Sequence, residues 1–466
     1  MQDPGESNNI IPPAGARAHR TLVLCFDGTG NEFDTANSNV IKFYSMLKKD
    51  SWNDQRVYYQ TGIGTYNTSS IVTPILSGVS KTLDMMVASS LGQHIMAGYE
   101  WLMQTYTAGD KISIFGFSRG AYTACALAAM LHKVGLLPAG HQMQIPLAYR
   151  LFSQDDEEGW KVSSLFKRTL SSEVEITFVG VWDIVGSVEK GLRRFTFGTK
   201  SAMRYFRHAL SLDEHRAKFN PCFYKDFVPS EIEDSSRRKA AKEDPFKKGH
   251  NHDLEKELGE LGETKPPADV LEVWFAGSHS DVGGGNVSSE ETNSLAQVPL
   301  RWMVRQCFLA KTGIMFYTDR LRTIGLDPDT LYPHVLPRPP PLSSSPSNGT
   351  KINGVSDRKD KDEKTLDSGA AMHITEEQMD FDDVRCDSYD ALDTARFWWI
   401  LEILPTRQRV QLADGTTIIK LKRHLGQARV IPKDIKVHRS VKIRIDNCEH
   451  YRSIAKVKKH NCQWVD

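Results

Sequence analysis

Short runs of apolar residues, most of them almost uninterrupted, recur along the chain and end in polar or glycine-rich turns. They span residues 21–26, 56–60, 111–115, 174–182 and 270–275. Uninterrupted apolar runs of this length are typical of strands that are covered on both faces. Residues 81–106 place apolar side chains at helical spacing, and residues 119–132 form an alanine-rich helical run. Strands that alternate with helices predict an α/β fold with a doubly wound, mostly parallel sheet.

Changes in composition divide the 466 residues into four parts. Residues 1–20 are polar and are expected to form a disordered tail, whereas residues 21–335 contain all the predicted strands. Inside that main domain, residues 233–265 hold 17 charged side chains, which predicts a solvated insertion because too little apolar surface is left to bury. Residues 336–370 are rich in Pro, Ser and charge, as linkers are. Residues 371–466 contain further apolar runs and are expected to fold.

The sharpest local motif is Gly116-Phe117-Ser118-Arg119-Gly120, which lies directly between a predicted strand and a predicted helix. This is the context of a nucleophile elbow, in which a serine occupies a tight, strained turn. The residues two positions from that serine must be small, and the helix N-terminus points at a site where negative charge develops. We therefore expect Ser118 to be a nucleophile. The alternative is a serine in a structural turn.

A nucleophilic serine needs a base, and the base needs an orienting carboxylate. Two later predicted strands run into suitable residues, the first into Asp183 and the second toward His279. Ligands bind outside the carboxyl ends of parallel strands, and Ser, Asp, His is the chain order of hydrolases with such an elbow. We expect His279 to be the base and Asp183 the acid. The rival acid is Asp281, which could instead brace the glycines that follow it.

Acyl transfer also needs donors for the oxyanion that forms at the attacked carbonyl. We expect one donor to be the backbone N–H of Arg119, directly after the nucleophile. The first predicted strand ends in Asp27-Gly28-Thr29-Gly30, so Gly28 or Thr29 is expected to supply the second. The alternative is a tight turn in which Asp27 caps its own loop.

The same turn suggests a competing chemistry, that of haloacid-dehalogenase-like phosphatases. Their nucleophilic aspartate stands two residues before a second aspartate, and here Cys25 occupies that position. The phosphatase interpretation therefore lacks its nucleophile. Gly62-Ile63-Gly64 lacks the third glycine of a dinucleotide-binding fingerprint, and we expect neither a cofactor nor a metal.

Several longer segments are familiar as a set. They are LCFDGTGN (24–31), GFSRGAYTA (116–124), FVGVWDIVGSV (178–188), HALSLDEHRAKFNP (208–221), WFAGSHSDVGGG (274–285), WWILEILP (398–405) and VHRSVKIR (437–444). Together they resemble the α/β-hydrolase family shared by the type VI secretion phospholipase effectors and many uncharacterised fungal and bacterial proteins. The resemblance implies a lipase-type triad that maps onto Ser118, Asp183 and His279, and a C-terminal region that packs on the hydrolase domain. It leaves His208, Asp213 and Arg216 without a role: they either line the pocket or belong to a helix braced by ion pairs.

Charge and cysteine content exclude several other functions. The 59 basic and 58 acidic side chains give a net charge of +1, which offers no attractive field for nucleic acid. The longest apolar run, residues 124–131, is far shorter than the roughly 20 residues of a membrane span, and the first residues do not form a signal-peptide pattern. Seven cysteines without a CxxC motif predict thiols in a reducing compartment and a cytoplasmic location.

The sequence therefore predicts a cofactor-independent serine hydrolase that cleaves acyl esters, of lipids or phospholipids, with transient contact to a membrane surface. A non-catalytic interaction protein that retains the fold is the alternative from another class. Two features stay open. The side chain of Arg119 either binds an anionic head group or pairs with a surface carboxylate, and residues 191–198 form either a lid or a packed loop.

Overall fold

The computed structural model describes residues 9–15, 19–28, 35–62, 79–154, 156–185, 202–224, 266–342, 375–395, 398–411, 417–432, 434–455 and 462–466. Its centre is an eight-stranded sheet in the order β12-β11-β7-β6-β5-β4-β2-β3, in which every neighbouring pair is parallel. The strands are β2 (Thr21–Phe26), β3 (Gln55–Gln60), β4 (Lys111–Phe117), β5 (Ile176–Trp182), β6 (Met203–Ser211), β7 (Asp269–Phe275), β11 (Ile435–His438) and β12 (Cys462–Val465).

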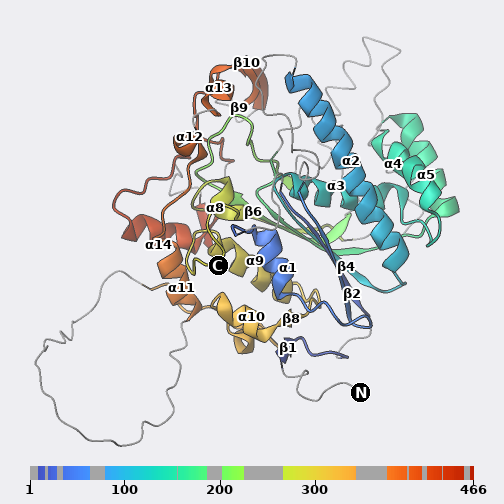
Figure 1. The fold of residues 1–466 in the computed structure, drawn as a ribbon, viewed down its shortest axis with the longest axis horizontal. Coiled ribbons are helices and arrows are strands. Elements are labelled where there is room, and N and C mark those ends of the chain that lie inside the picture. The colour runs from blue at the N-terminus through green and yellow to red at the C-terminus, as the bar shows by residue number, and fades with distance from the viewer. Residues whose placement is uncertain are drawn as a thin grey trace, which may run out of the picture.

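Helices cover both faces of this sheet (Figure 1). One face carries α2 (Val79–Thr105) and α3 (Arg119–Val134), with α4 (Ile145–Ser153), α5 (Glu157–Leu170) and the short η2 (Gln142–Gln144) beside them; the other carries α1 (Asn39–Met46) and α9 (Gln297–Leu309). Side chains of β2 alternate between the two cores: Leu22 and Leu24 join the first, and Val23 and Cys25 join the second. The predicted doubly wound α/β fold is thereby confirmed.

The elements predicted from apolar patterning are present at their expected places. The five predicted strands are β2, β3, β4, β5 and β7, and the two predicted helices are α2 and α3. Strands β2, β4 and β5 are buried along nearly their whole length, which is why they are nearly continuous in apolar residues.

Strand β6 is the central element that the apolar pattern did not predict. It contains Arg207 and His208, which interrupt the apolar run, yet it lies between β5 and β7. Both side chains are buried and bonded to neighbouring elements: Arg207 to Asp269 (2.9 Å), and His208 to Glu272 (3.2 Å). Of the two alternatives given for His208, the helix braced by ion pairs is therefore wrong, because His208 lies in a strand and bonds to the neighbouring strand β7.

The expected N-terminal tail, residues 1–20, also needs a correction. Ile10 and Ile11 form β1 (Ile10–Ile11), which pairs antiparallel with β8 (Phe316–Tyr317). Ile10 is buried, so these two apolar residues dock a segment that is polar in overall composition. The expectation of disorder is wrong for this part of the tail.

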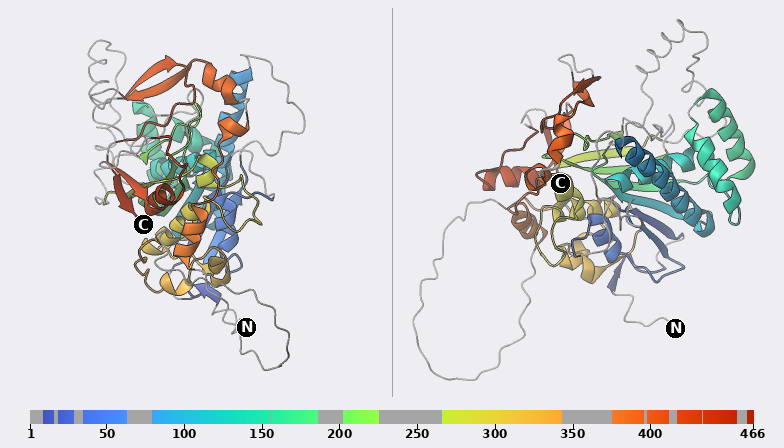
Figure 2. Two further views of the ribbon diagram at one scale, coloured as in Figure 1. Left: turned by 90° about the vertical axis from the view of Figure 1, so that its left-hand side faces the viewer. Right: turned by 45° about the horizontal axis from the view of Figure 1, so that its top comes forward.

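The C-terminal region extends the same sheet, because β11 pairs with β7 and β12 pairs with β11. Figure 2 shows its elements along one side of the molecule. Around the sheet lie α8 (His279–Gly283), α10 (Thr318–Thr323), η4 (Pro328–Thr330), α11 (Glu376–Asp383), α12 (Ala391–Thr394), α13 (Trp398–Ile403), the hairpin of β9 (Thr406–Gln411) and β10 (Thr417–Lys422), and α14 (Arg439–Asn447). Buried ion pairs fasten α11 to α9: Arg301 contacts Asp380 at 2.7 Å and also Asp383.

The predicted insertion (233–265), most of the predicted linker (336–370) and the segment 191–198 lie outside the described residues. Within the described ranges, helices are all too short or too polar to cross a membrane. The seven cysteines have free thiols, and Cys25, Cys125 and Cys307 among them are buried.

Candidate active site

Ser118 occupies a strained turn between β4 and α3. Its backbone angles, φ 57° and ψ −121°, lie in a region that L-residues other than glycine seldom adopt. The flanking glycines make this turn possible, because a Cβ on Gly116 would lie 2.4 Å from the carbonyl oxygen of Gly120. A Cβ on Gly120 would lie 2.3 Å from the carbonyl oxygen of Phe26. The turn therefore has the geometry of a nucleophile elbow, with Ser118 at the N-terminus of α3.

His279 is the first residue of α8, just beyond the carboxyl end of β7. Its imidazole lies against the ring of Phe117, the neighbour of Ser118, with 4.6 Å between ring centroids. The edge-to-face contact with Phe219, at 4.9 Å, holds the imidazole from another side. A Cβ on Gly283 would collide with Phe117, so this glycine lets α8 approach the elbow. Packing thus places His279 beside the elbow and excludes water from most of its ring.

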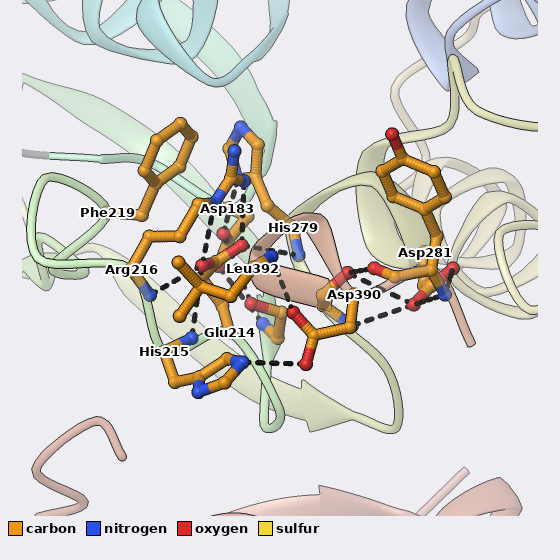
Figure 3. Close-up of polar contacts among 12 residues, drawn as sticks. Asp183, Glu214, His215, Arg216, Phe219, His279, Asp281, Asp390 and Leu392 are labelled. Atoms are coloured by element: carbon orange, nitrogen blue, oxygen red, sulfur yellow. Dashed lines mark hydrogen bonds and ion pairs between the residues drawn. The ribbon is translucent and has the colours of Figure 1, made fainter. Parts of the chain in front are cut away.

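Asp183 follows β5 directly and is completely buried. Its Oδ2 lies 2.6 Å from Nδ1 of His279, which is the contact expected of an orienting carboxylate (Figure 3). The hydroxyl and the backbone N–H of Ser211, at the end of β6, also donate to this carboxylate. An ionised Asp183 fixes the tautomer with the proton on Nδ1, which leaves Nε2 of His279 with a lone pair.

Arg429, from the C-terminal region, forms a two-pronged ion pair with the same carboxylate. Nη1 lies 2.6 Å from Oδ1 of Asp183, and Nη2 lies 2.8 Å from Oδ2. Burial by itself would raise the pKa of Asp183, but the charge of Arg429 and hydrogen bonds from His279 and Arg429 outweigh it and hold that pKa well below its usual range. Asp183 is therefore ionised at neutral pH. No local motif marks Arg429, so its contact with Asp183 is not predictable from the sequence.

Asp281, the rival acid, points elsewhere. It closes a capping box with Ser278 and accepts the backbone N–H of Tyr389 at 3.0 Å and the side-chain amide of Asn286 at 3.2 Å. Burial raises the pKa of Asp281 to about 6, although these donors oppose the shift. Of the two candidate carboxylates, Asp183 is the one in contact with the His279 ring.

The segment after β6 surrounds His279 with a second charged pair. Arg216 and Glu214 form two bonds, of 2.9 and 2.8 Å, and the Arg216 guanidinium stacks 3.4 Å from the centroid of Phe219. Glu214 also accepts the backbone N–H of His279 at 3.3 Å. Burial lowers the pKa of His279, while the hydrogen bond and charge of Asp183 and the charge of Glu214 oppose that shift. The net effect is a lowered pKa, so His279 is neutral at pH 7.

His208 on β6 and Asp213 just after it, to which the sequence assigned no definite role, hydrogen-bond to the backbone near Asp183 and His279. Nε2 of His208 accepts the backbone N–H of Ile184, the residue after Asp183, at 3.1 Å. Asp213 accepts the backbone N–H of Gly277 at 2.7 Å, two residues before His279. Both contacts fix the backbone that carries the Asp183–His279 pair. They join loops far apart in sequence, which is why residue spacing did not indicate them.

In the loop after β2, Asp27 adopts the alternative arrangement in which it caps its own loop. The N–H of Gly28 donates to Oδ1 of Asp27 at 2.7 Å, while Oδ2 accepts the hydroxyls of Ser38 and Tyr59, each at 2.9 Å. Asp27 thus caps its own loop and occupies the Gly28 N–H. Thr29 lies outside the described residues, and Arg119 is the first residue of α3. In the part of the chain that the structure describes, no three His, Cys, Asp or Glu side chains are grouped to hold a metal ion.

Comparison with known proteins identifies a family and a relative by sequence. The sequence model of the family described as "T6SS, Phospholipase effector Tle1-like, catalytic domain" matches residues 20–306. An uncharacterized protein of Saccharomyces cerevisiae is 27% identical, in an alignment that covers 96% of this chain and 82% of the relative.

Two solved structures are similar at lower identity. An uncharacterized protein from Pseudomonas aeruginosa matches with a TM-score of 0.33 and 16% identity over 65% of this chain and 47% of that chain. A Tle1 effector, solved bound to the VgrG spike of the type 6 secretion system, matches with a TM-score of 0.29 and 18% identity over 57% of this chain and 51% of that chain. This chain thus matches about half the length of each of these two chains.

Proposed function

The chain belongs to the family of Tle1-like phospholipase effector catalytic domains, and on this basis we propose that it is a serine hydrolase of lipid acyl esters. Family membership supports a lipid ester as substrate class. The observation that carries the proposal is the contact between Asp183 and His279 beside a strained Ser118. A buried carboxylate–imidazole pair next to a nucleophile elbow is the arrangement that serine hydrolases use for acyl transfer.

In the proposed reaction, Oγ of Ser118 attacks the acyl carbonyl carbon while Nε2 of His279 takes the hydroxyl proton. Asp183 keeps the proton on Nδ1 and stabilises the imidazolium that forms. The N–H of Arg119 and a donor from the loop after β2, Gly28 or Thr29, bind the oxyanion; in the Gly28 case its N–H must first leave Asp27. His279 returns the proton to the leaving alcohol, and water then hydrolyses the acyl-enzyme by the same route.

The electrostatics support this division of roles. The pKa of His279 is lowered mainly by burial, so its imidazole accepts a proton at neutral pH. Asp183 stays ionised because Arg429 offsets the cost of burying its charge. The site therefore has a neutral base and a charged acid at the same pH, as the mechanism needs. The free thiols further support our proposal of a cytoplasmic location, because a reducing compartment preserves them.

The test is labelling with a fluorophosphonate probe, together with hydrolysis of p-nitrophenyl esters of graded chain length and of phospholipid vesicles. We expect Ser118→Ala to lose labelling and turnover without loss of thermal stability, because one hydroxyl is removed and the backbone turn is kept. Ser113→Ala is the matched control. Ser113 is buried in β4, and its hydroxyl makes no hydrogen bond within the described structure, so this variant should keep full activity.

Labelling that persists in Ser118→Ala would place the nucleophile elsewhere. A folded wild-type chain that neither labels nor hydrolyses any of these esters would instead favour a non-catalytic interaction protein with a retained fold.

A further inference from the structure

Arg429 lies outside the part of the chain that matches the family model, residues 20–306, yet it contacts the centre of the candidate site. It is separated from Asp183 by 246 residues in sequence, and its side chain is 2% exposed. Burying a guanidinium is costly unless its donors are paired, and here they are paired with three residues of the hydrolase core.

Each nitrogen of the guanidinium has a defined acceptor. Nη1 and Nη2 hold the two oxygens of Asp183, and Nη1 also donates to the hydroxyl of Ser211 at 2.7 Å and to its carbonyl at 3.0 Å. Nε donates to the carbonyl of Phe219 at 3.0 Å, and the ring of Phe219 is the one that abuts His279. A single side chain thus fixes the carboxylate and one wall of the imidazole.

We propose that Arg429 is a positioning residue of the active site, which clamps Asp183 in register with His279 and offsets its charge. This inference rests on the proposed function. It also means that the C-terminal region supplies part of the catalytic machinery, so that residues 20–306 do not contain a complete site.

The clamp has an electrostatic consequence for the base. Oδ2 of Asp183 lies between Nδ1 of His279 (2.6 Å) and Nη2 of Arg429 (2.8 Å), so the two cationic groups are within about 6 Å, the range over which neighbouring charges shift a pKa. Arg429 disfavours the imidazolium, and its loss must raise the apparent pKa of the coupled Asp183–His279 pair. Among the described residues, the other charged groups around His279 are Glu214 and Arg216 after β6, which pair with each other, and Asp281 on its own helix.

The experiment compares kcat/KM against pH, from about pH 5 to 9, for wild type, Arg429→Gln and Arg429→Lys, with a p-nitrophenyl ester as substrate. Loss of the charge in Arg429→Gln should move the acidic limb of the profile upward by about one pH unit. At pH values below the acidic limbs of both proteins, kcat/KM of the variant should therefore be about tenfold lower than that of wild type. Arg429→Lys keeps the charge but not the fork. It should keep the limb near its wild-type position and lower the plateau, because a lysine cannot hold both carboxylate oxygens.

Arg305→Gln is the matched control, because Arg305 is another buried arginine. Its Nε donates to Glu376 at 2.9 Å, and this ion pair lies away from the site. It should lower the melting temperature and leave the pH profile unchanged. An Arg429→Gln profile that coincides with wild type overturns the inference while the proposed function stands. If Arg429→Gln does not fold, the test rests on Arg429→Lys. A plateau of kcat/KM equal to that of wild type in Arg429→Lys would overturn the inference that the arginine clamps Asp183. A folded wild type without labelling or hydrolysis removes the proposed function, and the inference with it.

Discussion

Exchange of Asp183 for asparagine separates the two candidate acids, because the structure gives each carboxylate a different set of partners. Oδ2 of Asp183 receives His279 and one prong of Arg429, and Oδ1 receives the other prong and the N–H of Ser211. An amide offers one acceptor where the carboxylate offers two. In Asp183→Asn, an amide that keeps its oxygen toward Ser211 directs its NH₂ group at Nδ1 of His279.

That orientation favours the tautomer with the proton on Nε2, which cannot accept a proton from Ser118. The same exchange in a chymotrypsin-type triad lowers turnover about 10⁴-fold, which corresponds to about 5 kcal/mol of transition-state free energy. Asp183→Asn also leaves the buried Arg429 without its counter-charge, and breaking a buried ion pair in this way destabilises a protein by about 3–5 kcal/mol. We therefore expect both the turnover and the melting temperature to fall.

Asp281→Asn should behave differently, because Asp281 accepts from Ser278, Asn286 and Tyr389 and does not contact the His279 ring. A buried donor left unsatisfied costs about 1–3 kcal/mol, so its main effect is on stability. The assay measures turnover of a p-nitrophenyl ester and thermal unfolding on both variants. If Asp281→Asn unfolded at the wild-type temperature and were nevertheless the less active of the two, the assignment of Asp183 as the acid would be refuted.

Two further expectations concern the elbow and the attachment of the C-terminal region. Gly116→Ala should lose fluorophosphonate labelling and about 1–3 kcal/mol of stability, because its Cβ would overlap the carbonyl of Gly120; wild-type labelling of this variant would contradict the elbow geometry. His215 contacts Asp390 at 2.7 Å and the carbonyl of Gly426 at 3.2 Å, and the Asp390 hydrogen bond raises its pKa although burial opposes the shift. His215→Gln should therefore lower the melting temperature most below pH 6.5, where this stabilisation is complete. The effect should become progressively smaller as the pH rises through the raised pKa of His215. A difference in melting temperature between wild type and variant that grows with pH would contradict this expectation.

The sequence was informative where burial leaves a local pattern. Strands β4 and β5 are buried on both faces and are therefore nearly continuous in apolar residues, and the elbow follows from glycines at fixed distances from Ser118. Strand β6 was not predicted, because the buried Arg207 interrupts its apolar run. Its partners lie on β7 and α9, which are far from it in sequence.

Long-range pairing also explains the other omissions. The clamp by Arg429 joins segments 246 residues apart, and an arginine in a polar loop has no local feature that distinguishes it from a solvated one. The choice between Asp183 and Asp281 depended on the direction of two side chains beyond the ends of β5 and β7, and side-chain direction is not encoded in chain order.

The long sequence separation of this clamp also determines when the site is finished during biosynthesis. Ribosomes extend chains at about 5–20 residues per second, so the 246 residues between Asp183 and Arg429 correspond to roughly 12–50 s of translation. Once His279 has been added, 96 residues after Asp183, both members of the pair are on the nascent chain while the counter-charge has not yet been synthesised. A truncated chain that ends before residue 429 would keep the contacts of Asp183 with His279 and Ser211 but would lack the counter-charge. The proposed site is thus complete only once Arg429 has been synthesised.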